Sequence, residues 1–447
     1  MTALPSIEDA CVTVVGLGYI GVPLLDILSR RTTSTIIGYD TDKDRVHLLS
    51  NGQDYTETLT VHEAKRLSEN VEITTNALVL EKTDVFVVTV PTPIDEYKIP
   101  NLDAIISVSV AINQALISRK KMRAKSDLCA KRAVVIYEST VYPGTTNDIC
   151  EQILSKGSLR IHTDFDIVYS PERLSPGADS RRINEISKIV SGSSKDAVDW
   201  AIRFYSQIID EEIYATSSIK VAEAAKILEN TQRDVNIALV NELTGLFYQM
   251  GISIHEVIEA ASSKWNFHPY KPGLVGGHCI GVDPYYLTYQ SRRFGQELRI
   301  VNASRTVNDN MAGWYARTLV KNYVRYSTKT VSRSRLLFLG ASFKEDCNDL
   351  RNSKALLLAD ILSQYSFDVD ICDHYVGDKC IEDEGKQYVI RKEPKGSYDV
   401  VVFAVAHKYY KDNWMHVIQR ASEHSGVKPY VVDLKNILPE GTTSLSL

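Results

Sequence analysis

The feature that most constrains the fold of this chain is a glycine-rich turn between an apolar run and a helical pattern. The apolar run Val12 to Val15 is followed by Gly16, Gly18 and Gly21 in the spacing G-x-G-x-x-G. Such a run is typical of a strand buried on both faces of a parallel sheet. A second strand pattern, STIIGYD, ends at Asp40. Strand, glycine turn, helix, strand and acid in this order predict an α/β fold with a Rossmann unit that binds a dinucleotide. The alternative is a glycine-rich turn with a structural role only.

The same residues indicate the cofactor. The glycines allow a pyrophosphate to approach the helix N-terminus, and Asp40 can accept hydrogen bonds from ribose hydroxyls. A carboxylate at this position repels a 2′-phosphate, so we expect NAD rather than NADP. Lys43 and Arg45 favour NADP instead, because a nearby basic side chain could hold that phosphate.

Polar residues follow three further predicted strands. Thr92 follows VFVVTV, Thr140 follows AVVIYES, and Glu172 and Arg173 follow FDIVYSP. Ligands of open parallel sheets bind at the carboxyl ends of the strands, so these side chains are candidate ligand contacts. Each threonine could equally cap a turn or a helix.

Composition limits the class of protein. The chain has 447 residues, enough for two or three domains, and a formal net charge of −5, which gives no basic footprint for nucleic acid. The apolar runs are too short to span a membrane, and the N-terminus has no signal-peptide pattern. Seven cysteines without a CxxC pair argue against a disulfide framework and against a metal site. We therefore expect a cytoplasmic enzyme with reduced thiols.

A long helix is predicted from about Ile219 to Met250, because this stretch lacks proline and is rich in alanine, leucine and glutamate. Lys226, Asn230 and Arg233 fall on one face of it. A solvated face is the ordinary explanation of such a stripe, and a functional site is the alternative.

The last third predicts a second α/β domain. A strand at residues 336–339 runs into Gly340 and a polar loop, a helix follows, and DVDICD, YDVVVFAVAH and PYVVDLKN add strands. Lys344 and Arg351 in the loop could hold a phosphate or could be solvated charges.

The stretch LVGGHCIGVDPYYL places Cys279 beside paired glycines, with Asp283 four residues later. Gly276 and Gly277 suggest backbone that another group approaches closely. An inert buried thiol is the alternative to a reactive one.

Several stretches together resemble the UDP-glucose/GDP-mannose dehydrogenase family. They are VVGLGYIGVPL, TVPTPID, ESTVYPGTTN, YSPERLSPG, AEAAKILENTQRDVNIALVNE, GLVGGHCIGVDPYYL and FKEDCNDLRNS, and they span nearly the whole chain. Within the family, SPERLSPG resembles the UDP-N-acetylhexosamine 6-dehydrogenases, above all the UDP-N-acetylglucosamine enzymes of the Vi-polysaccharide type. UDP-glucose enzymes usually carry a second glutamate where this chain has Pro176.

The resemblance implies three domains: an NAD-binding Rossmann domain at residues 1–212, a central helical dimerisation and catalytic domain at 213–330, and a Rossmann-like UDP-sugar-binding domain at 331–447. It also implies a homodimer. The implied reaction oxidises the sugar C6 alcohol twice, with two NAD+ molecules, to a carboxylate, for surface polysaccharide biosynthesis. Cys279 would hold the carbon as a thiohemiacetal and then as a thioester.

Site residues follow from the resemblance position by position. The implied catalytic residues are Cys279, Lys226, Asn230, Asp283 and Glu172. The implied cofactor contacts are Gly16, Gly18, Tyr19, Ile20, Gly21, Asp40, Arg45, Thr92, Thr140 and Arg351. The implied substrate contacts are Arg173, Leu174, Lys226, Asn230, Arg233, Lys271, Gly273, Phe343 and Lys344. Lys271 departs from the family pattern, because relatives often carry an arginine there that is offered to a neighbouring subunit's substrate.

Two other functions would account for part of the pattern. A single-step NAD-dependent 3-hydroxyacid dehydrogenase would share the Rossmann start and a helical lysine, but it has no need of Cys279. A non-enzymatic nucleotide-sugar sensor would not need Cys279, Lys226 and Asp283 together. The sequence leaves the epimer open among the N-acetylated glucosamine, galactosamine and mannosamine sugars, because one or two hydroxyl contacts decide it.

Overall fold

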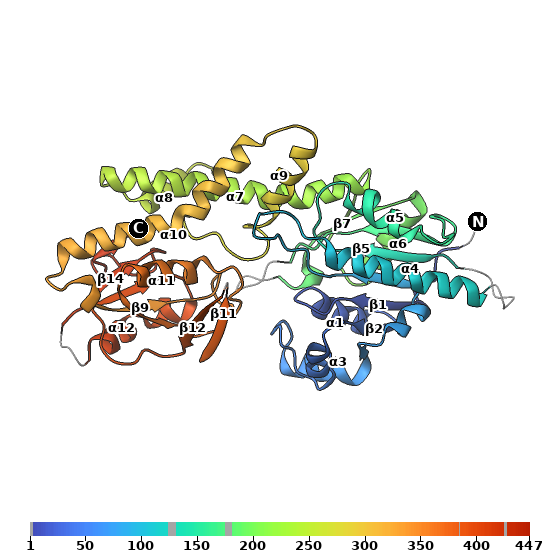
Figure 1. The fold of residues 1–447 in the computed structure, drawn as a ribbon, viewed down its shortest axis with the longest axis horizontal. Coiled ribbons are helices and arrows are strands. Elements are labelled where there is room, and N and C mark those ends of the chain that lie inside the picture. The colour runs from blue at the N-terminus through green and yellow to red at the C-terminus, as the bar shows by residue number, and fades with distance from the viewer. Residues whose placement is uncertain (1–2, 124–130, 175–180, 384, 424–426) are drawn as a thin grey trace. The chain divides into compact units, whose positions relative to one another are not determined.

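The computed structural model describes residues 3–123, 131–174, 181–383, 385–423 and 427–447 (Figure 1). These residues form two compact units. The first comprises the described residues up to Glu229 together with Tyr285–Gly295, and the second comprises Asn230–Pro284 and Gln296–Leu447. Pro176, on which the comparison with UDP-glucose enzymes depends, lies outside the described residues.

An eight-stranded sheet forms the centre of the first unit. Its order is β3-β2-β1-β4-β5-β6-β7-β8, and every pair is parallel except β6 with β7. The strands are β1 Cys11–Val15, β2 Thr35–Tyr39, β3 Glu72–Thr74, β4 Val85–Val88, β5 Ala133–Tyr137, β6 Phe165–Tyr169, β7 Lys188–Gly192 and β8 Ile213–Ala215. The order 3-2-1-4-5-6 is that of a dinucleotide-binding Rossmann sheet, and the direction of strand addition reverses between β1 and β4.

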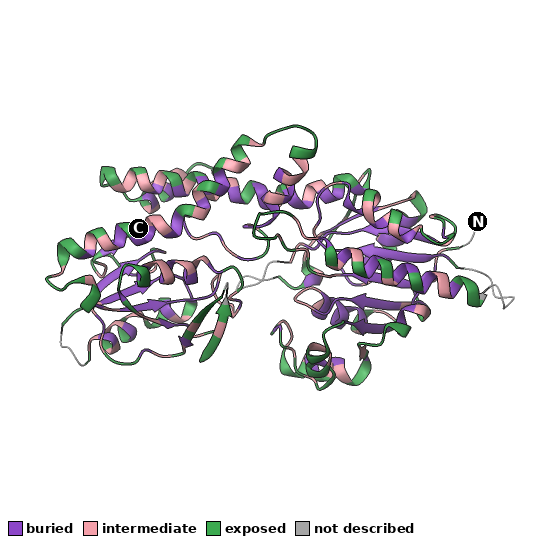
Figure 2. Cartoon of the chain, viewed as in Figure 1, coloured by how far each residue is buried: buried purple, intermediate pink, exposed green. Residues whose placement is uncertain are grey.

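Helices connect these strands and cover them. They are α1 Gly21–Arg31, α2 Lys43–Ser50, α3 Val61–Asn70, α4 Asp103–Arg123, α5 Glu151–Leu154 and α6 Lys195–Tyr205, with short 3-10 segments at Ala77–Lys82 and Ile183–Glu185 and a π-helical turn at Thr146–Cys150. The central strands are buried on both faces, as Figure 2 shows for β1 and β5. Their valine-rich sequence is what a strand covered on both faces requires.

A seven-stranded sheet forms the centre of the second unit, in the order β11-β12-β10-β9-β13-β14-β15. The strands are β9 Arg335–Leu339, β10 Asp368–Cys372, β11 Lys379–Asp383, β12 Lys386–Arg391, β13 Val400–Phe403, β14 Tyr430–Asp433 and β15 Leu445–Ser446. All pairs are parallel except the β11–β12 hairpin. The accompanying helices are α8 Ile254–Ser262, α10 Arg299–Tyr326, α11 Lys354–Gln364 and α12 Lys408–Ser422, with a 3-10 turn at Val331–Arg333.

The predicted long helix is confirmed as α7, Ile219–Met250, with 32 residues. At the usual rise it is about 48 Å long. It ends where Gly251 adopts a φ of +69°, a left-handed conformation that favours glycine. The α/β class with two mainly parallel sheets is likewise confirmed. No helix in the described ranges is both long and apolar enough to cross a lipid bilayer.

Candidate active site

The glycine loop of the first unit has the shape that a pyrophosphate site needs. Gly16 has a φ of +96°, and a Cβ on Gly21 would lie 1.9 Å from the Gly16 carbonyl oxygen. A Cβ on Gly18 would meet no atom within 4 Å. Gly21 is therefore required for the contact between helix and loop, whereas Gly18 leaves open space beside the helix N-terminus. The first turn of α1 contains no acidic residue that would repel a phosphate.

Asp40 stands directly after β2 and is only 6% exposed. Its Oδ2 accepts hydrogen bonds from the Leu17 amide at 2.7 Å and from Arg45 Nη1 at 3.1 Å, and its Oδ1 accepts from the Asp42 amide at 2.9 Å. The Arg45 guanidinium also lies 4.9 Å from the centre of the Tyr55 ring. Arg45, which could have held a 2′-phosphate, is thus held against Asp40, and Oδ1 retains a lone pair for a ribose hydroxyl.

Two other cofactor candidates border the same loop. Ile20 is the N-cap residue of α1, and its apolar side chain leaves the first amides of the helix without a side-chain cap. Tyr19 precedes it and is half-buried. Uncapped amides at a helix N-terminus form a ready site for a phosphate group.

Thr92 and Thr140 are brought together, one from the loop after β4 and the other from the loop after β5. Thr92 Oγ1 donates a hydrogen bond to the Thr140 carbonyl at 2.6 Å. The Tyr286 hydroxyl in turn donates to the Thr92 carbonyl. Because the Thr92 hydroxyl proton is used in this contact, the hydroxyl can meet a ligand only as an acceptor.

Glu172 and Arg173 follow β6. Glu172 is buried, with Oε1 accepting from the Leu174 amide, and Oε2 has no hydrogen-bond partner among the described residues. Arg173 donates to the Ser187 carbonyl at 2.9 Å and forms an ion pair with Glu229 at 2.9 Å. A buried carboxylate oxygen without a partner is costly unless a ligand satisfies it, so Glu172 is the stronger candidate of the two.

Lys226 on α7 is buried, with 6% of its surface exposed, so a solvated face does not explain it. One turn earlier, buried Glu223 accepts hydrogen bonds from the amides of Gly144 at 2.5 Å and Thr146 at 2.9 Å. Burial raises the pKa of Glu223 to about 7. Sequence reasoning missed Glu223, although its spacing of three residues before Lys226 was visible.

In the second unit, Asn230 and Asp283 form a buried pair. The Asn230 side-chain nitrogen donates to Asp283 Oδ2 at 2.6 Å. The Cys279 carbonyl accepts from the Asp283 amide at 2.8 Å, in a turn that leads into α9, Asp283–Arg293. Cys279 itself is exposed, so the hypothesis of an inert buried thiol does not hold. Arg233 and Lys271 are also exposed.

The paired glycines beside Cys279 are closely approached, but by groups of the protein itself. A Cβ on Gly277 would lie 2.7 Å from the Phe343 ring, and one on Gly276 would lie 2.5 Å from the Asn352 carbonyl oxygen. Asn352 Nδ2 also donates to the Gly277 carbonyl at 2.8 Å. The glycines therefore join the Cys279 loop to the loop that carries the UDP candidates, a contact that sequence reasoning missed.

Gly273, a candidate substrate contact, is clamped by an asparagine of α7. The Asn241 side chain accepts from the Gly273 amide at 2.8 Å and donates to the Gly273 carbonyl at 3.0 Å. It also donates to Asn308 Oδ1 at 2.8 Å, and Asn308 donates to Asp234, which is paired with Arg305. This buried polar chain was not predicted, because nothing in the local pattern links α7 to α10.

The remaining candidates lie on the loop after β9. The Phe343 amide donates to the Asp349 carbonyl at 3.1 Å. The Lys344 carbonyl accepts from Ser342 Oγ at 2.8 Å, and Arg351 donates twice to Asp349, at 2.9 and 2.8 Å. These hydrogen bonds within the loop fix its backbone conformation.

The candidates thus divide between the units. The first unit contains Gly16, Gly18, Tyr19, Ile20, Gly21, Asp40, Arg45, Thr92, Thr140, Glu172, Arg173, Leu174 and Lys226, and the second contains Asn230, Arg233, Lys271, Gly273, Cys279, Asp283, Phe343, Lys344 and Arg351.

Three domain models of one family match the chain in order. They are the NAD binding domain of the UDP-glucose/GDP-mannose dehydrogenase family at residues 10–214, its central domain at 220–310 and its UDP binding domain at 337–440. The chain is also 41% identical to a UDP-N-acetyl-D-glucosamine 6-dehydrogenase of Pseudomonas aeruginosa, over 98% of this chain and 100% of that one. This chain belongs to the UDP-glucose/GDP-mannose dehydrogenase family. It is an NAD-dependent UDP-sugar dehydrogenase, and its Gly16 loop and Asp40 lie within the range matched by the NAD binding domain.

Two further relatives of this dehydrogenase bear on its substrate. The first is a UDP-N-acetyl-D-glucosamine 6-dehydrogenase of Salmonella typhi, which is 37% identical over 99% of both chains. The second is the solved structure of a UDP-D-ManNAc dehydrogenase from Pyrococcus horikoshii, with a TM-score of 0.82, 26% identity and 98% coverage of both chains.

Proposed function

We propose that this dehydrogenase oxidises C6 of UDP-N-acetylglucosamine to the carboxylate, in two steps that each use one NAD+, for surface polysaccharide biosynthesis. The observation that carries the proposal is the full-length similarity to two UDP-N-acetyl-D-glucosamine 6-dehydrogenases, at 41% and 37% identity. The exposed thiol of Cys279 supports the same reaction, because addition of a thiolate holds an aldehyde in place and converts it into a species that can lose a second hydride.

The proposed chemistry starts with removal of the C6 hydroxyl proton, which Lys226 takes up or shares while it steadies the developing oxyanion with Asn230. The Gly16 loop and Asp40 would hold NAD+, which would supply the acceptor for the hydride that leaves C6. The Cys279 sulfur then adds to the aldehyde carbon, and the carbonyl oxygen is protonated to give a thiohemiacetal. Loss of a second hydride from C6, for which a second NAD+ would be the acceptor, together with loss of the hydroxyl proton gives a thioester.

Hydrolysis completes the reaction. Asp283 orients or activates the water that attacks the thioester carbon, and the Cys279 thiolate leaves and is reprotonated. Glu172 shapes the sugar pocket, and its partnerless Oε2 supports a polar contact to the substrate or to this water. Reduced Cys279 requires a reducing compartment, so we place the enzyme in the cytoplasm.

Binding is assigned to the other candidates. Gly16, Gly18, Tyr19, Ile20, Gly21, Asp40, Arg45, Thr92, Thr140 and Arg351 contact NAD, and Arg173, Leu174, Arg233, Lys271, Gly273, Phe343 and Lys344 contact the UDP-sugar. The division into domains at residues 1–212, 213–330 and 331–447 and the homodimer belong to the same proposal. The ranges of the three family models support the division.

A second candidate substrate is UDP-N-acetylmannosamine, favoured by the fold match to the Pyrococcus horikoshii enzyme at 26% identity. UDP-N-acetylgalactosamine is the third epimer. The lower identity of the mannosamine relative is the reason for preferring the glucosamine sugar. An epimer at C2 or C4 changes only one or two hydrogen bonds, so each must be assayed.

The test measures NADH formation with NAD+ and each of UDP-N-acetylglucosamine, UDP-N-acetylgalactosamine, UDP-N-acetylmannosamine and UDP-glucose. We expect the highest kcat/KM for UDP-N-acetylglucosamine and two NADH for each sugar consumed. A higher kcat/KM for another epimer would transfer the proposal to that sugar. One NADH for each sugar would indicate a single-step dehydrogenase, and no turnover with any of the four would favour a nucleotide-sugar sensor.

A further inference from the structure

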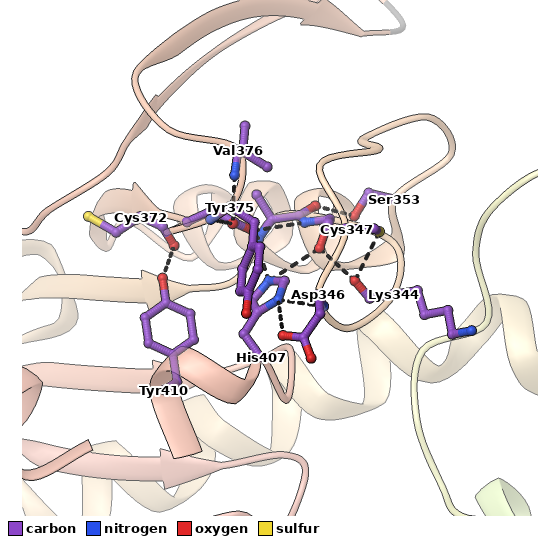
Figure 3. A network of polar contacts seen from close by, with 12 residues as sticks. Lys344, Asp346, Cys347, Ser353, Cys372, Tyr375, Val376, His407 and Tyr410 are labelled. Carbon is purple, nitrogen blue, oxygen red and sulfur yellow. Dashed lines mark hydrogen bonds and ion pairs between the residues drawn. The ribbon is translucent and has the colours of Figure 1, made fainter. Parts of the chain in front are cut away.

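His407 follows β13 and is completely buried at the centre of a polar network in the second unit (Figure 3). Its Nδ1 accepts a hydrogen bond from the Asp346 amide at 2.9 Å. Its Nε2 lies 3.1 Å from Asp373 Oδ2 and 3.3 Å from Ser342 Oγ. Because a backbone amide can only donate, Nδ1 must carry the lone pair and Nε2 the proton, which points to Asp373.

Asp373, directly after β10, accepts hydrogen bonds from the start of the loop that follows β9 and from the residues that come just after Asp373 itself. It is fully buried, and Oδ2 accepts from the amides of Ala341 at 2.7 Å and Ser342 at 3.2 Å, besides His407. Its Oδ1 accepts from the amides of Tyr375 at 2.9 Å and Val376 at 3.1 Å. Burial by itself would raise the pKa of Asp373, but the hydrogen bonds from His407 and the amides outweigh it and lower the pKa.

This arrangement repeats, in altered form, the one at the NAD site. Asp40 follows the second strand of its unit and accepts from the amide of Leu17, the residue after Gly16. Asp373 follows the corresponding strand and accepts from the amide of Ala341, the residue after Gly340. Whereas Asp40 retains a lone pair on Oδ1, both oxygens of Asp373 are occupied by the protein. The acid here holds its glycine loop in place instead of binding a ribose.

The loop held in this way, residues 341–351, carries Phe343 and Lys344. Asp373 fixes its beginning, and His407 fixes its middle through the Asp346 amide. Asp346 has a φ of +51°, which a residue other than glycine rarely adopts unless its surroundings enforce it. Ser342 Oγ lies between His407 and the Lys344 carbonyl, to which it donates at 2.8 Å.

We propose that His407, supported by Asp373, is a positioning residue that holds the 341–351 loop in the conformation that binds the UDP part of the substrate. The proposal rests on the proposed role of Phe343 and Lys344 as UDP contacts. A buried histidine that only stabilised the core would affect unfolding but not the affinity for one of the two substrates.

The test uses two substitutions that each keep one half of the imidazole. In His407→Gln the side-chain amide reaches the Nε2 position and can donate to Asp373, but the Asp346 amide loses its acceptor. In His407→Asn the side-chain oxygen stays near the Nδ1 position and can accept from Asp346, but the donor to Asp373 is lost. Since one unpaired buried amide corresponds to roughly a tenfold change in affinity, we expect His407→Gln to raise KM for the UDP-sugar about tenfold and His407→Asn to raise it less.

The other kinetic constants separate positioning from general damage. KM for NAD+ and kcat should stay within about twofold in both variants, because Arg351, the proposed NAD contact at the far end of the loop, is held by Asp349 and not by His407. Tyr410→Phe is the matched control: it removes a buried hydroxyl that donates to the Cys372 carbonyl at 3.1 Å in the same network, without a contact to the loop. It should lower Tm and leave KM for the UDP-sugar unchanged.

Two results would overturn the proposal: an unchanged KM for the UDP-sugar in His407→Gln, or an equal rise in Tyr410→Phe. If His407→Gln does not fold, Ser342→Ala replaces it, and an unchanged KM there also overturns the proposal. Calorimetric titration of each variant with UDP alone separates this inference from the proposed function. Weaker UDP binding in His407→Gln supports the positioning role even if no UDP-sugar is turned over, and unchanged UDP binding overturns it even if the enzyme is active.

Discussion

The side chain of Asn230 donates to the carboxylate of Asp283 at 2.6 Å, across 53 positions of sequence, and both residues are buried. Asp283→Asn keeps the size of the side chain but removes the base proposed for hydrolysis. We expect steady-state turnover to fall roughly 10²-fold or more, since a general base typically contributes that much. A rapid-quench or stopped-flow record should still show a first burst of NADH. Turnover close to that of the wild type would mean that Asp283 only holds Asn230.

Cys279 is tested by two substitutions. Cys279→Ala should retain the first hydride transfer and stop with bound aldehyde, because no nucleophile remains. Cys279→Ser should stop as a covalent ester, which hydrolyses more slowly than a thioester. Both should lose steady-state turnover by orders of magnitude, with little change in UDP-sugar binding. Intact-protein mass spectrometry after incubation with UDP-sugar and NAD+ should find an adduct on the serine variant. Release of uronic acid by the alanine variant at the wild-type rate would exclude Cys279 as the nucleophile.

Asp40 should set the preference for NAD+ over NADP+. In the wild type its carboxylate repels a 2′-phosphate and holds Arg45 Nη1 at 3.1 Å. Asp40→Ala removes the repulsion and releases Arg45, so the ratio of kcat/KM for NAD+ to that for NADP+ should fall by at least about tenfold. Asp44→Ala removes an exposed carboxylate from α2, the helix that also carries Arg45, and should leave the ratio of the two kcat/KM values unchanged. Equal use of both cofactors by the wild type would contradict the role given to Asp40.

An apolar stripe on α7 should mediate the proposed homodimer. Val221, Leu228, Leu239 and Leu246 are 46%, 62%, 55% and 52% exposed. At 100° per residue they fall within about 20° of one another around the helix. Leu239→Asp should give a monomer in sedimentation velocity at micromolar concentration. Gln249→Asp, at an exposed polar position of the same helix, should remain a dimer. A monomeric wild type would rule the interface out.

Glu223 should make stability depend on pH. Its folded pKa of about 7 lies above the ordinary 4.5, so folding favours the protonated carboxyl. The contribution is complete below about pH 4.5 and is lost as pH rises through about 7, up to roughly 3 kcal/mol for such a shift. Urea unfolding at pH 5, 6, 7 and 8 should show a steeper loss of stability in the wild type than in Glu223→Gln, which cannot ionise.

Glu242→Gln is the control for this experiment, because it alters an exposed carboxylate of the same helix, α7. Its unfolding free energy should follow the wild-type pH profile. Parallel profiles for the wild type and Glu223→Gln would show that Glu223 does not titrate in this range.

Local patterns explain why much of the fold could be predicted. The Gly16 loop, Asp40 and both ends of α7 depend on residues that are close in sequence, such as Gly251 after the helix. The β11–β12 hairpin was not predicted, because its two strands contain several charged residues and no long apolar run.

The parts of the site that were missed depend on tertiary contacts. Asn241 is hydrogen-bonded to Gly273, which lies 32 positions away in the sequence, and Asp373 is hydrogen-bonded to His407, which lies 34 positions away. Asp373 and His407 are the last residues of the predicted strand stretches DVDICD and YDVVVFAVAH, and this position is the local signal that could have marked them. The paired glycines at 276 and 277 were expected to be closely approached, and no local pattern could identify Phe343 and Asn352 as groups that approach them.

The occupied carboxylate of Asp373 has a kinetic consequence. Its two oxygens already receive four amides and His407, so the acid of the C-terminal sheet has no lone pair to offer a ribose. In the proposed four-electron reaction, both NAD+ molecules therefore use the Gly16 loop in succession. The half-oxidised sugar must wait at Cys279 while NADH departs and the next NAD+ arrives. The rate of that exchange sets the shortest lifetime that the intermediate must survive without escaping as free aldehyde.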